Sequence, residues 1–333
     1  MNIVFFEVQE WEKEPLKAAF PEAILSEDKL TNENASQFTN AEIISSFIYC
    51  SLNQEVLNQL PNLKFITTRS TGYDHIDLQA SKSKNILVAN VPEYGSVTVA
   101  EHTFALILTL TRRIYQSINQ AKQFDFFDHR DIKGIDIFGK KLGIVGLGKI
   151  GMTVLKMAHG FGMQILVYTR TRDENLAKEL NFEYRELDQL LAEADIITLH
   201  LPYNEHTHHT INKDNITKMK KGSYLVNTAR GGLVETEALI LGFEKNILAG
   251  VGLDVLEEEK ELCEETEILT AEHLQHVDYK TLVLDHVLMN HPNVVITPHN
   301  AFNSKEALDR ITHTTIDNIN AFLKGTPINL ITL

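Results

Sequence analysis

The chain has 333 residues, 43% of them hydrophobic and 23% charged, which suits a globular protein of two domains. Its 31 basic and 45 acidic side chains give a formal net charge of −14, which argues against nucleic acid or an anionic membrane as a partner. The two cysteines, Cys50 and Cys263, belong to no C-x-x-C pair, so neither a disulfide framework nor a metal site is expected. No apolar run is long enough to span a membrane and no leader-like segment follows Met1, so we expect a soluble, cytoplasmic protein.

The first hundred residues alternate short strand-like runs with helical stretches. Strands are expected at 2–6, 43–49, 65–68 and 86–89, with helices such as 11–19 and 54–60 between them. This alternation is typical of βαβ units in a parallel sheet, where ligands bind beyond the carboxyl ends of the strands. The turn at Thr71 and Gly72, directly after the third strand, is therefore a candidate site loop, with a plain connection as the alternative.

Residues 97–115 are apolar on nearly every face. A helix of that composition is buried all round, either by a second domain or by a partner chain. We expect it to form the hinge between two domains and a contact in a homodimer.

Residues 141–172 combine an apolar strand, a G-x-G-x-x-G turn, an amphipathic helix and a second strand. Gly146 permits the tight turn, Gly148 lets a pyrophosphate approach the main chain, and Gly151 lets the helix pack closely on the strand. The helix start at Lys149 and Ile150 offers unpaired N–H groups to the phosphates. The stretch therefore predicts dinucleotide binding.

Further strands are expected at 195–201, 223–227, 249–255 and 294–297, and a last helix at 303–324 should return to the first domain. The predicted fold class is α/β, with two Rossmann-like domains, each a doubly wound parallel sheet. The predicted substrate domain is discontinuous and comprises residues 1–101 and 300–333. The predicted dinucleotide-binding domain comprises residues 102–299.

Three stretches place polar side chains directly after predicted strands. Arg230 follows one, Asp254 and an acidic run at 257–267 follow another, and His299 follows a third. A guanidinium can hold a carboxylate with two parallel hydrogen bonds, and histidine with a nearby carboxylate forms a general acid/base pair. Most of the acidic run is expected to be a solvated face.

The chain resembles the D-isomer-specific 2-hydroxyacid dehydrogenases, and most closely their D-lactate dehydrogenase branch. The resemblance covers nearly the whole chain, and the length of the segment between Glu259 and His299 fits that branch. It rests on these segments, all in family order: RSTGYDHID, NVPEYGSVTVAEH, GLGKIG, HLPYNEHTHHTIN, NTARGGLVETEAL, GVGLDVLEEE and TPHNAF.

The resemblance implies roles for particular residues. Arg230 would bind the substrate carboxylate and carbonyl, His299 would be the general acid/base, and Glu259 its orienting carboxylate. The implied substrate contacts are Thr71, Gly72, Tyr94 and Phe302. Beyond the glycine turn, the expected cofactor contacts are Val99, Lys149, Ile150, Thr169, Leu201, Pro202, Thr207, Thr228, Ala229, Arg230 and Asp254.

The implied reaction is reduction of a small 2-keto acid to a D-2-hydroxy acid, and glyoxylate or hydroxypyruvate reduction is the close alternative. Protonated His299 would supply the proton, and Glu259 would stabilise the imidazolium. A formate dehydrogenase relative is disfavoured, because that branch carries Gln where this chain has Glu259. A non-enzymatic, cofactor-sensing binding protein is a rival from another class, which a turnover assay would exclude.

The chain departs from the family pattern where the cofactor ribose should bind. NAD-using members carry an Asp at the end of the second strand, whereas this chain has Thr169 there. A threonine does not repel a 2′-phosphate, and Arg170 and Arg172 add charged donors. The sequence therefore favours NADP, with NAD as the alternative if both arginines point to solvent.

Overall fold

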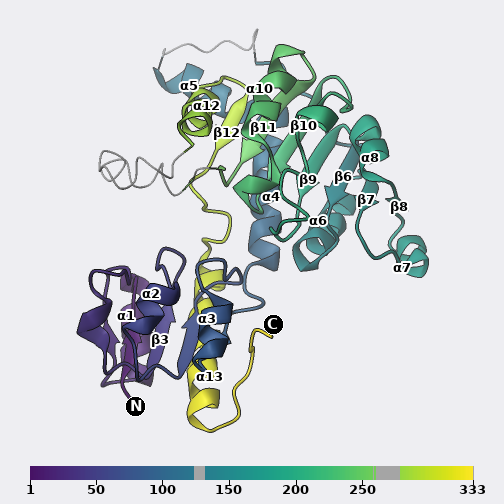
Figure 1. Cartoon of the computed structure of the whole chain (residues 1–333). Coiled ribbons are helices and arrows are strands. Elements are labelled where there is room, and N and C mark those ends of the chain that lie inside the picture. Colours follow the sequence, from purple (N-terminus) through teal and green to yellow (C-terminus); the bar gives the residue numbers. More distant parts are fainter. Residues whose placement is uncertain (124–131, 258, 260–277, 333) are drawn as a thin grey trace. The chain divides into compact units, whose positions relative to one another are not determined.

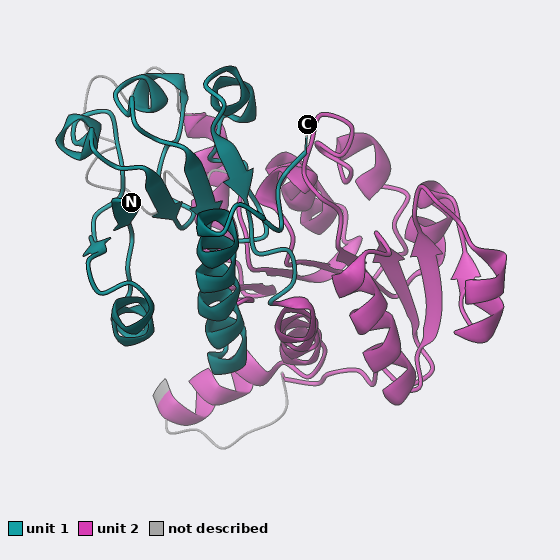
Figure 2. Cartoon of the chain, turned by 90° about the horizontal axis from the view of Figure 1, so that it is seen from below, with its two compact units in different colours: residues 1–94, 303–333 teal, residues 95–302 magenta. Residues whose placement is uncertain are grey.

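The computed structural model describes residues 1–123, 132–257, 259 and 278–332. Cys263, most of the acidic run and residues 260–277 lie outside this part of the chain. The chain divides into two compact units, residues 1–94 with 303–333 and residues 95–302 (Figures 1 and 2). Each unit has its own parallel sheet with helices on both faces, which confirms the predicted α/β class.

The first unit, residues 1–94 and 303–333, has a sheet of order β2-β1-β3-β4-β5. Every strand pair in it is parallel. Its strands are β1 (Ile3–Phe5), β2 (Ile24–Leu25), β3 (Ile43–Ser46), β4 (Phe65–Thr68) and β5 (Leu87–Ala89). Its helices are α1 (Glu10–Ala19), the 3-10 turn η1 (Ala35–Phe38), α2 (Gln54–Asn58), α3 (Leu78–Ser83) and α13 (Lys305–Leu323).

The core of this unit lies on both faces of its sheet. Helices α2 and α3 pack on one face, and α1 and α13 pack on the other. On the α13 side the Phe322 ring stacks on that of Phe65, with centroids 4.4 Å apart. Asn318 of α13 is fully buried, and its amide donates to Thr67 Oγ1 at 3.2 Å and to the Asn90 carbonyl at 2.9 Å. Residues 303–333 thus complete the core that residues 1–94 begin.

The second unit, residues 95–302, has a sheet of order β12-β11-β10-β9-β6-β7-β8. Its strands are β6 (Lys141–Val145), β7 (Gln164–Tyr168), β8 (Glu183–Tyr184), β9 (Ile196–Leu199), β10 (Ser223–Asn227), β11 (Leu248–Leu253) and β12 (Val294–Ile296). Its helices are α4 (Ser96–Thr111), α5 (Ile114–Gln123), α6 (Lys149–Gly160), α7 (Glu174–Glu179), α8 (Leu187–Glu193), α9 (Lys213–Ile216), η2 (Gly231–Leu233), α10 (Thr236–Glu244) and α12 (Tyr279–Met289).

Apolar residues of the second sheet alternate between its two faces. Ile165 and Val167 of β7 face α4 and α6, whereas Leu166 between them faces the side covered by α8, α10 and α12. Strand β6 lies between β7 and β9, so the order of the strands reverses there. In parallel sheets a crevice for ligands forms at such a reversal, beyond the carboxyl ends of the strands.

The stretch 97–115 is two helices rather than one helix buried all round. Helix α4 ends at Thr111, and Arg113 adopts a left-handed φ of 50° before α5 begins. Val97 is 51% exposed and Tyr115 is 55% exposed. In the single chain α4 packs on the sheet through one stripe, with Phe104 and Ile107 among the buried residues, so burial of its other faces by a partner chain stays a prediction. Among the described helices, none has both the length and the apolar character that a membrane crossing needs.

Candidate functional site

The glycine turn between β6 and α6 has the geometry that dinucleotide binding requires. Gly146 has a φ of +101°, and a Cβ there would lie 2.6 Å from the His200 carbonyl oxygen. A Cβ at Gly151 would lie 2.1 Å from the Gly146 carbonyl oxygen. A Cβ at Gly148 would meet nothing within 4 Å. The first and third glycines are therefore required by packing, and the second faces open space.

Helix α6 begins at Lys149 with Gly148 as its N-cap, and no side chain caps it. The N–H groups of a first helical turn attract anions, and the helix dipole adds to that attraction. The turn lies where β6 meets β9, at the reversal of strand order. Glycine backbone, helix start and open space together fit the pyrophosphate of a dinucleotide.

The loop after β9 carries three of the predicted cofactor contacts, Leu201, Pro202 and Thr207. Thr207 Oγ1 donates to the Pro202 carbonyl at 2.7 Å and accepts from the Asn204 N–H at 2.9 Å, which folds the loop back on itself. His200 precedes the loop, and burial lowers its pKa to about 3. Its neutral ring shares a hydrogen bond with Thr198 Oγ1 at 3.0 Å.

The loop after β10 carries Thr228 and Ala229. Thr228 is buried, and its hydroxyl lies 3.0 Å from that of Thr103 on α4. The Ala229 N–H donates to Asn227 Oδ1 at 3.0 Å. Val99, another predicted cofactor contact, is 8% exposed on α4. These contacts fix the loop against α4.

Thr169 and Arg170 directly follow β7, where the ribose of a dinucleotide is expected. Thr169 is half-buried and Arg170 is exposed. Arg172 is engaged elsewhere, since its Nη2 lies 2.6 Å from Glu186 Oε1 and its guanidinium lies 5.6 Å from the Tyr184 ring centroid. The two arginines that the sequence suggested for a 2′-phosphate thus differ, because Arg172 pairs with Glu186 whereas Arg170 is exposed.

The ends of β10, β11 and β12 are tied together by backbone hydrogen bonds. The Asp254 N–H donates to the Asn227 carbonyl at 2.9 Å, and the His299 N–H donates to the Asp254 carbonyl at 2.8 Å. Arg230 leaves β10 in an extended conformation, and its carbonyl accepts from the Asn227 side chain at 2.8 Å. Its Nη1 donates to the Ala229 carbonyl at 2.7 Å. The sheet thus brings Arg230, Asp254 and His299 to one edge.

Asp254 organises the loop that carries His299. Its carboxylate is 1% exposed, and it accepts from Thr297 Oγ1 at 2.5 Å and from the N–H groups of Asn300 at 2.8 Å and Ala301 at 2.9 Å. The sequence predicted a cofactor contact at Asp254. The described hydrogen bonds of its carboxylate go to this loop.

His299 and Glu259 lie forty positions apart in the sequence and meet in the structure. His299 Nδ1 lies 2.5 Å from Glu259 Oε1, with both side chains about one-quarter exposed. The His299 backbone is left-handed, with a φ of 47°. The Phe302 ring lies edge-on to the imidazole, with centroids 6.4 Å apart. Because Glu259 holds Nδ1, the ring can exchange a proton through Nε2.

The predicted substrate contacts of the first unit also follow strands. Thr71 comes after β4, and its Oγ1 donates to the Val91 carbonyl at 2.8 Å. The Gly72 carbonyl accepts from Ser70 Oγ at 2.5 Å. Tyr94 comes after β5, and its carbonyl accepts from Arg310 Nε at 2.7 Å. These residues line the carboxyl edge of the first sheet.

Sequence reasoning missed the buried Arg69 directly before this loop. Its side chain is 1% exposed and pairs with Glu12 at 2.7 Å, and it donates to the carbonyls of Phe6 at 2.6 Å and Glu7 at 3.0 Å. Burial raises the pKa of Glu12, against the lowering by Arg69. The motif RSTG contains this arginine, but no local signal says that the side chain turns inward.

Comparison with known proteins identifies the family. Residues 104–301 match the NAD binding domain of the D-isomer specific 2-hydroxyacid dehydrogenases. A 2-hydroxyacid dehydrogenase homolog of Zymomonas mobilis is 38% identical over 88% of this chain and 86% of its own length. The Aquifex aeolicus D-lactate dehydrogenase, solved with NAD and lactic acid, superposes with a TM-score of 0.87 at 37% identity, covering 98% of this chain and 96% of its own.

An acyclic imino acid reductase solved with NADPH also superposes, with a TM-score of 0.82 at 27% identity over the whole of both chains. Structural relatives thus bind either nicotinamide dinucleotide, and their similarity to this chain spans both of its units. The match to an NAD binding domain agrees with the geometry of the glycine turn. This chain belongs to the D-isomer specific 2-hydroxyacid dehydrogenase family and is an NAD(P)-dependent oxidoreductase.

Proposed function

We propose that the enzyme reduces a small 2-keto acid of the pyruvate type to the D-2-hydroxy acid, with Arg230, Glu259 and His299 as the catalytic set. The observation that carries this proposal is the 2.5 Å hydrogen bond between His299 Nδ1 and Glu259 Oε1. That bond orients an imidazole at the edge of the sheet where Arg230 also lies. A 2-keto acid needs both a proton donor for its carbonyl and a cation for its carboxylate.

A nicotinamide dinucleotide held at the glycine turn of Gly146, Gly148 and Gly151 would supply the hydride for reduction of the keto carbon. His299 delivers the proton to the carbonyl oxygen through Nε2, while Glu259 stabilises the imidazolium. Arg230 holds the substrate carboxylate and offsets the negative charge that grows on the carbonyl oxygen. In the reverse direction, neutral His299 accepts the proton. Thr71, Gly72, Tyr94 and Phe302 are proposed to contact the rest of the substrate.

A panel of keto acids tests the function. Oxidation of NADH and of NADPH would be followed by the absorbance of the reduced nicotinamide. The substrates would be pyruvate, glyoxylate, hydroxypyruvate, phenylpyruvate and oxaloacetate. The highest kcat/KM with pyruvate would support the D-lactate type. Preference for glyoxylate or hydroxypyruvate would assign the alternative. No turnover with any of them would favour a cofactor-sensing binding protein.

The cofactor preference is proposed to be NADP. Thr169 replaces the carboxylate that would repel a 2′-phosphate, and the exposed Arg170 can add a charge-assisted donor. Thr169→Asp should reverse a preference for NADPH, and Arg170→Ala should weaken NADPH far more than NADH. Arg172→Ala is the matched control, because that guanidinium already pairs with Glu186. A wild-type preference for NADH of about tenfold, which corresponds to about 1.4 kcal/mol, would refute the proposal.

A homodimer and a cytoplasmic location belong to the same proposal. The α5 side chains Ile114, Tyr115 and Ile118 are each more than two-fifths exposed, as are Val283 and Val287 of α12. Apolar side chains exposed in this number favour a protein–protein contact. Light scattering coupled to size exclusion measures the assembly directly, and a monomer across the tested concentrations would contradict it.

A further inference from the structure

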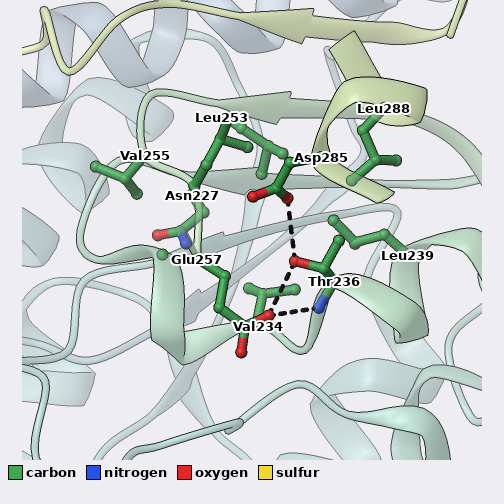
Figure 3. A pocket seen from close by; sticks show the side chains of 11 residues that line it. Asn227, Val234, Thr236, Leu239, Leu253, Val255, Glu257, Asp285 and Leu288 are labelled. Atoms are coloured by element: carbon green, nitrogen blue, oxygen red, sulfur yellow. Dashed lines mark hydrogen bonds between the residues drawn. The ribbon is translucent and has the colours of Figure 1, made fainter. Parts of the chain in front are cut away.

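A second polar cluster lies in the second unit, and Figure 3 shows three of its members, Thr236, Glu257 and Asp285. Glu257 Oε2 accepts from the Thr236 N–H at 3.0 Å and from Thr236 Oγ1 at 2.9 Å. Glu257 Oε1 is hydrogen-bonded to His209 Nε2. Thr236 Oγ1 also lies 3.2 Å from Oδ1 of the fully buried Asp285. We call these four residues the Glu257 brace.

The Glu257 brace borders a small cavity of about 10 Å³ with a largely apolar lining, which includes Leu239, Leu253 and Leu288. Glu257 is only 16% exposed, although it belongs to the acidic run that the sequence assigned mostly to solvent. A carboxylate in such surroundings is costly unless hydrogen bonds satisfy it, and those bonds are stronger there than in water. The brace is therefore a rigid element rather than a surface ion pair.

One end of the brace contacts the loop that presents Arg230. The His209 N–H donates to the Gly232 carbonyl at 2.9 Å. A Cβ on Gly231 would lie 1.8 Å from the Leu256 carbonyl oxygen and 2.6 Å from the Glu257 nitrogen. The backbone at Gly231 and Gly232 is thus held between His209 on one side and the segment of Glu257 on the other.

The other end of the brace contacts the segment that presents the general-acid partner. Glu259 follows Glu257 by two positions, and its carboxylate bonds to His299 Nδ1. Thr236, at the start of α10, anchors the Glu257 side chain by two hydrogen bonds to its Oε2. Because only two positions separate Glu257 from Glu259, an anchored Glu257 limits how far Glu259 can lie from it.

We propose that His209 and Glu257 are positioning residues that fix where Arg230 and Glu259 lie relative to each other. The inference rests on the proposed function, because it assumes that these two residues act on one substrate. Misplacement of a catalytic group by about 1 Å costs on the order of 10²-fold in rate, so loosening the brace should impair catalysis before it unfolds the protein.

The test compares four variants by keto-acid reduction at saturating cofactor. His209→Ala removes the donor to Glu257 and should raise KM for the keto acid and lower kcat together, by about tenfold in kcat/KM or more. The alkaline limb of its pH profile should move to lower pH, because Glu259 then supports the His299 imidazolium less well. His209→Gln keeps an N–H donor and should restore most of the loss.

Glu257→Gln keeps the shape and the acceptor for Thr236, and weakens only the charged bond to His209, so it should give an intermediate loss. His206→Ala is the matched control on the same loop, where that histidine is 84% exposed and outside the brace. The control should behave as wild type. Circular dichroism and gel filtration establish folding, and the two Gln variants carry the test if His209→Ala does not fold.

The outcomes separate the two proposals. A wild-type enzyme without keto-acid turnover contradicts the proposed function. The positioning role alone is overturned if wild type turns over a keto acid and the variants match it. That means that Glu257→Gln and His209→Ala keep kcat/KM within about twofold and keep the alkaline limb of the pH profile. A lowered thermal midpoint with no change in KM or pH limb also overturns it, since that is the signature of a merely structural pair. The positioning role would also be overturned if His206→Ala lost as much kcat/KM as the variants of His209 and Glu257.

Discussion

Replacing Asp254 by Asn tests whether this carboxylate holds the loop that carries His299. The substitution keeps the size of the side chain and removes one of its two acceptor oxygens. The carboxylate now accepts from Thr297 Oγ1, Asn300 N–H and Ala301 N–H. The amide NH₂ of an asparagine would face at least one of these donors, so one hydrogen bond is lost and a buried N–H is left without an acceptor.

The cost can be worked from these contacts. A hydrogen bond to a charged acceptor contributes about 1.5–3 kcal/mol, and a buried unsatisfied donor costs about 1–3 kcal/mol. The left-handed backbone of His299 stores strain of about 1–3 kcal/mol, which persists only while its surroundings hold it. At its upper end, the free energy lost with the hydrogen bond is larger than the backbone strain at His299. The loop should therefore relax and carry His299 away from Glu259. We expect a loss of about 2–4 kcal/mol in unfolding free energy and of about 10²-fold in kcat.

Urea unfolding followed by fluorescence and circular dichroism measures the first quantity, and steady-state kinetics measures the second. The control is Asp188→Asn in the same unit, whose carboxylate is 58% exposed and pairs with Lys218. That surface pair should contribute less than about 1 kcal/mol. If Asp254→Asn keeps its stability and kcat and loses only cofactor affinity, Asp254 acts through the cofactor and the reasoning about the loop is wrong.

Further predictions concern the catalytic set and one partly buried carboxylate. His299→Ala should lose about 10²–10⁴-fold in kcat with near-normal cofactor binding, measured by steady-state kinetics and cofactor titration, and Glu259→Gln should shift the pH profile for reduction to lower pH. Arg230→Lys keeps the charge but loses the bidentate fork, so KM should rise and kcat should fall, whereas wild-type kinetics would place Arg230 outside the pocket. Burial of Asp195 is outweighed by hydrogen bonds from Lys220 and the Lys141 N–H, so its pKa lies below the usual range. A lowered folded-state pKa gives stability that is present above the unfolded value and is lost as pH falls, so Asp195→Asn should cost about 1 kcal/mol at neutral pH. In urea unfolding that difference should shrink below about pH 4, and a pH-independent difference would contradict the assignment.

The sequence predicted the central strands and the longer helices closely. Strand β10 begins and ends where the pattern at 223–227 placed it, and β12 and α13 lie within the predicted ranges 294–297 and 303–324. Strands β2 and β8 were missed because each has only two residues at the edge of a sheet, too few for an alternation to register. The break at Arg113 was missed because no glycine or proline marks it.

The candidate site was visible in the sequence only where its geometry is local. The glycine turn could be derived from spacing, because strand, turn and helix follow one another along the chain. The approach of Glu259 to His299 depends on two strand ends that meet in space, and family resemblance rather than spacing pointed to it. The inward turn of Arg69 and the burial of Glu257 had no sequence signal, because both depend on what covers the side chain.

The contribution of α13 to the first unit has a consequence for the order of folding during synthesis. Residues 1–94 leave the ribosome first, yet their sheet lacks the Phe322 ring and the Asn318 clamp until the last thirty or so residues have been made. Residues 95–302 are contiguous and can close their own core earlier. Domains usually complete in the order in which they are translated, but here the unit that starts first should finish last. Until α13 has been made, the apolar face that α13 covers on the sheet of the first unit is open. This face is therefore the part of the nascent chain most in need of a chaperone.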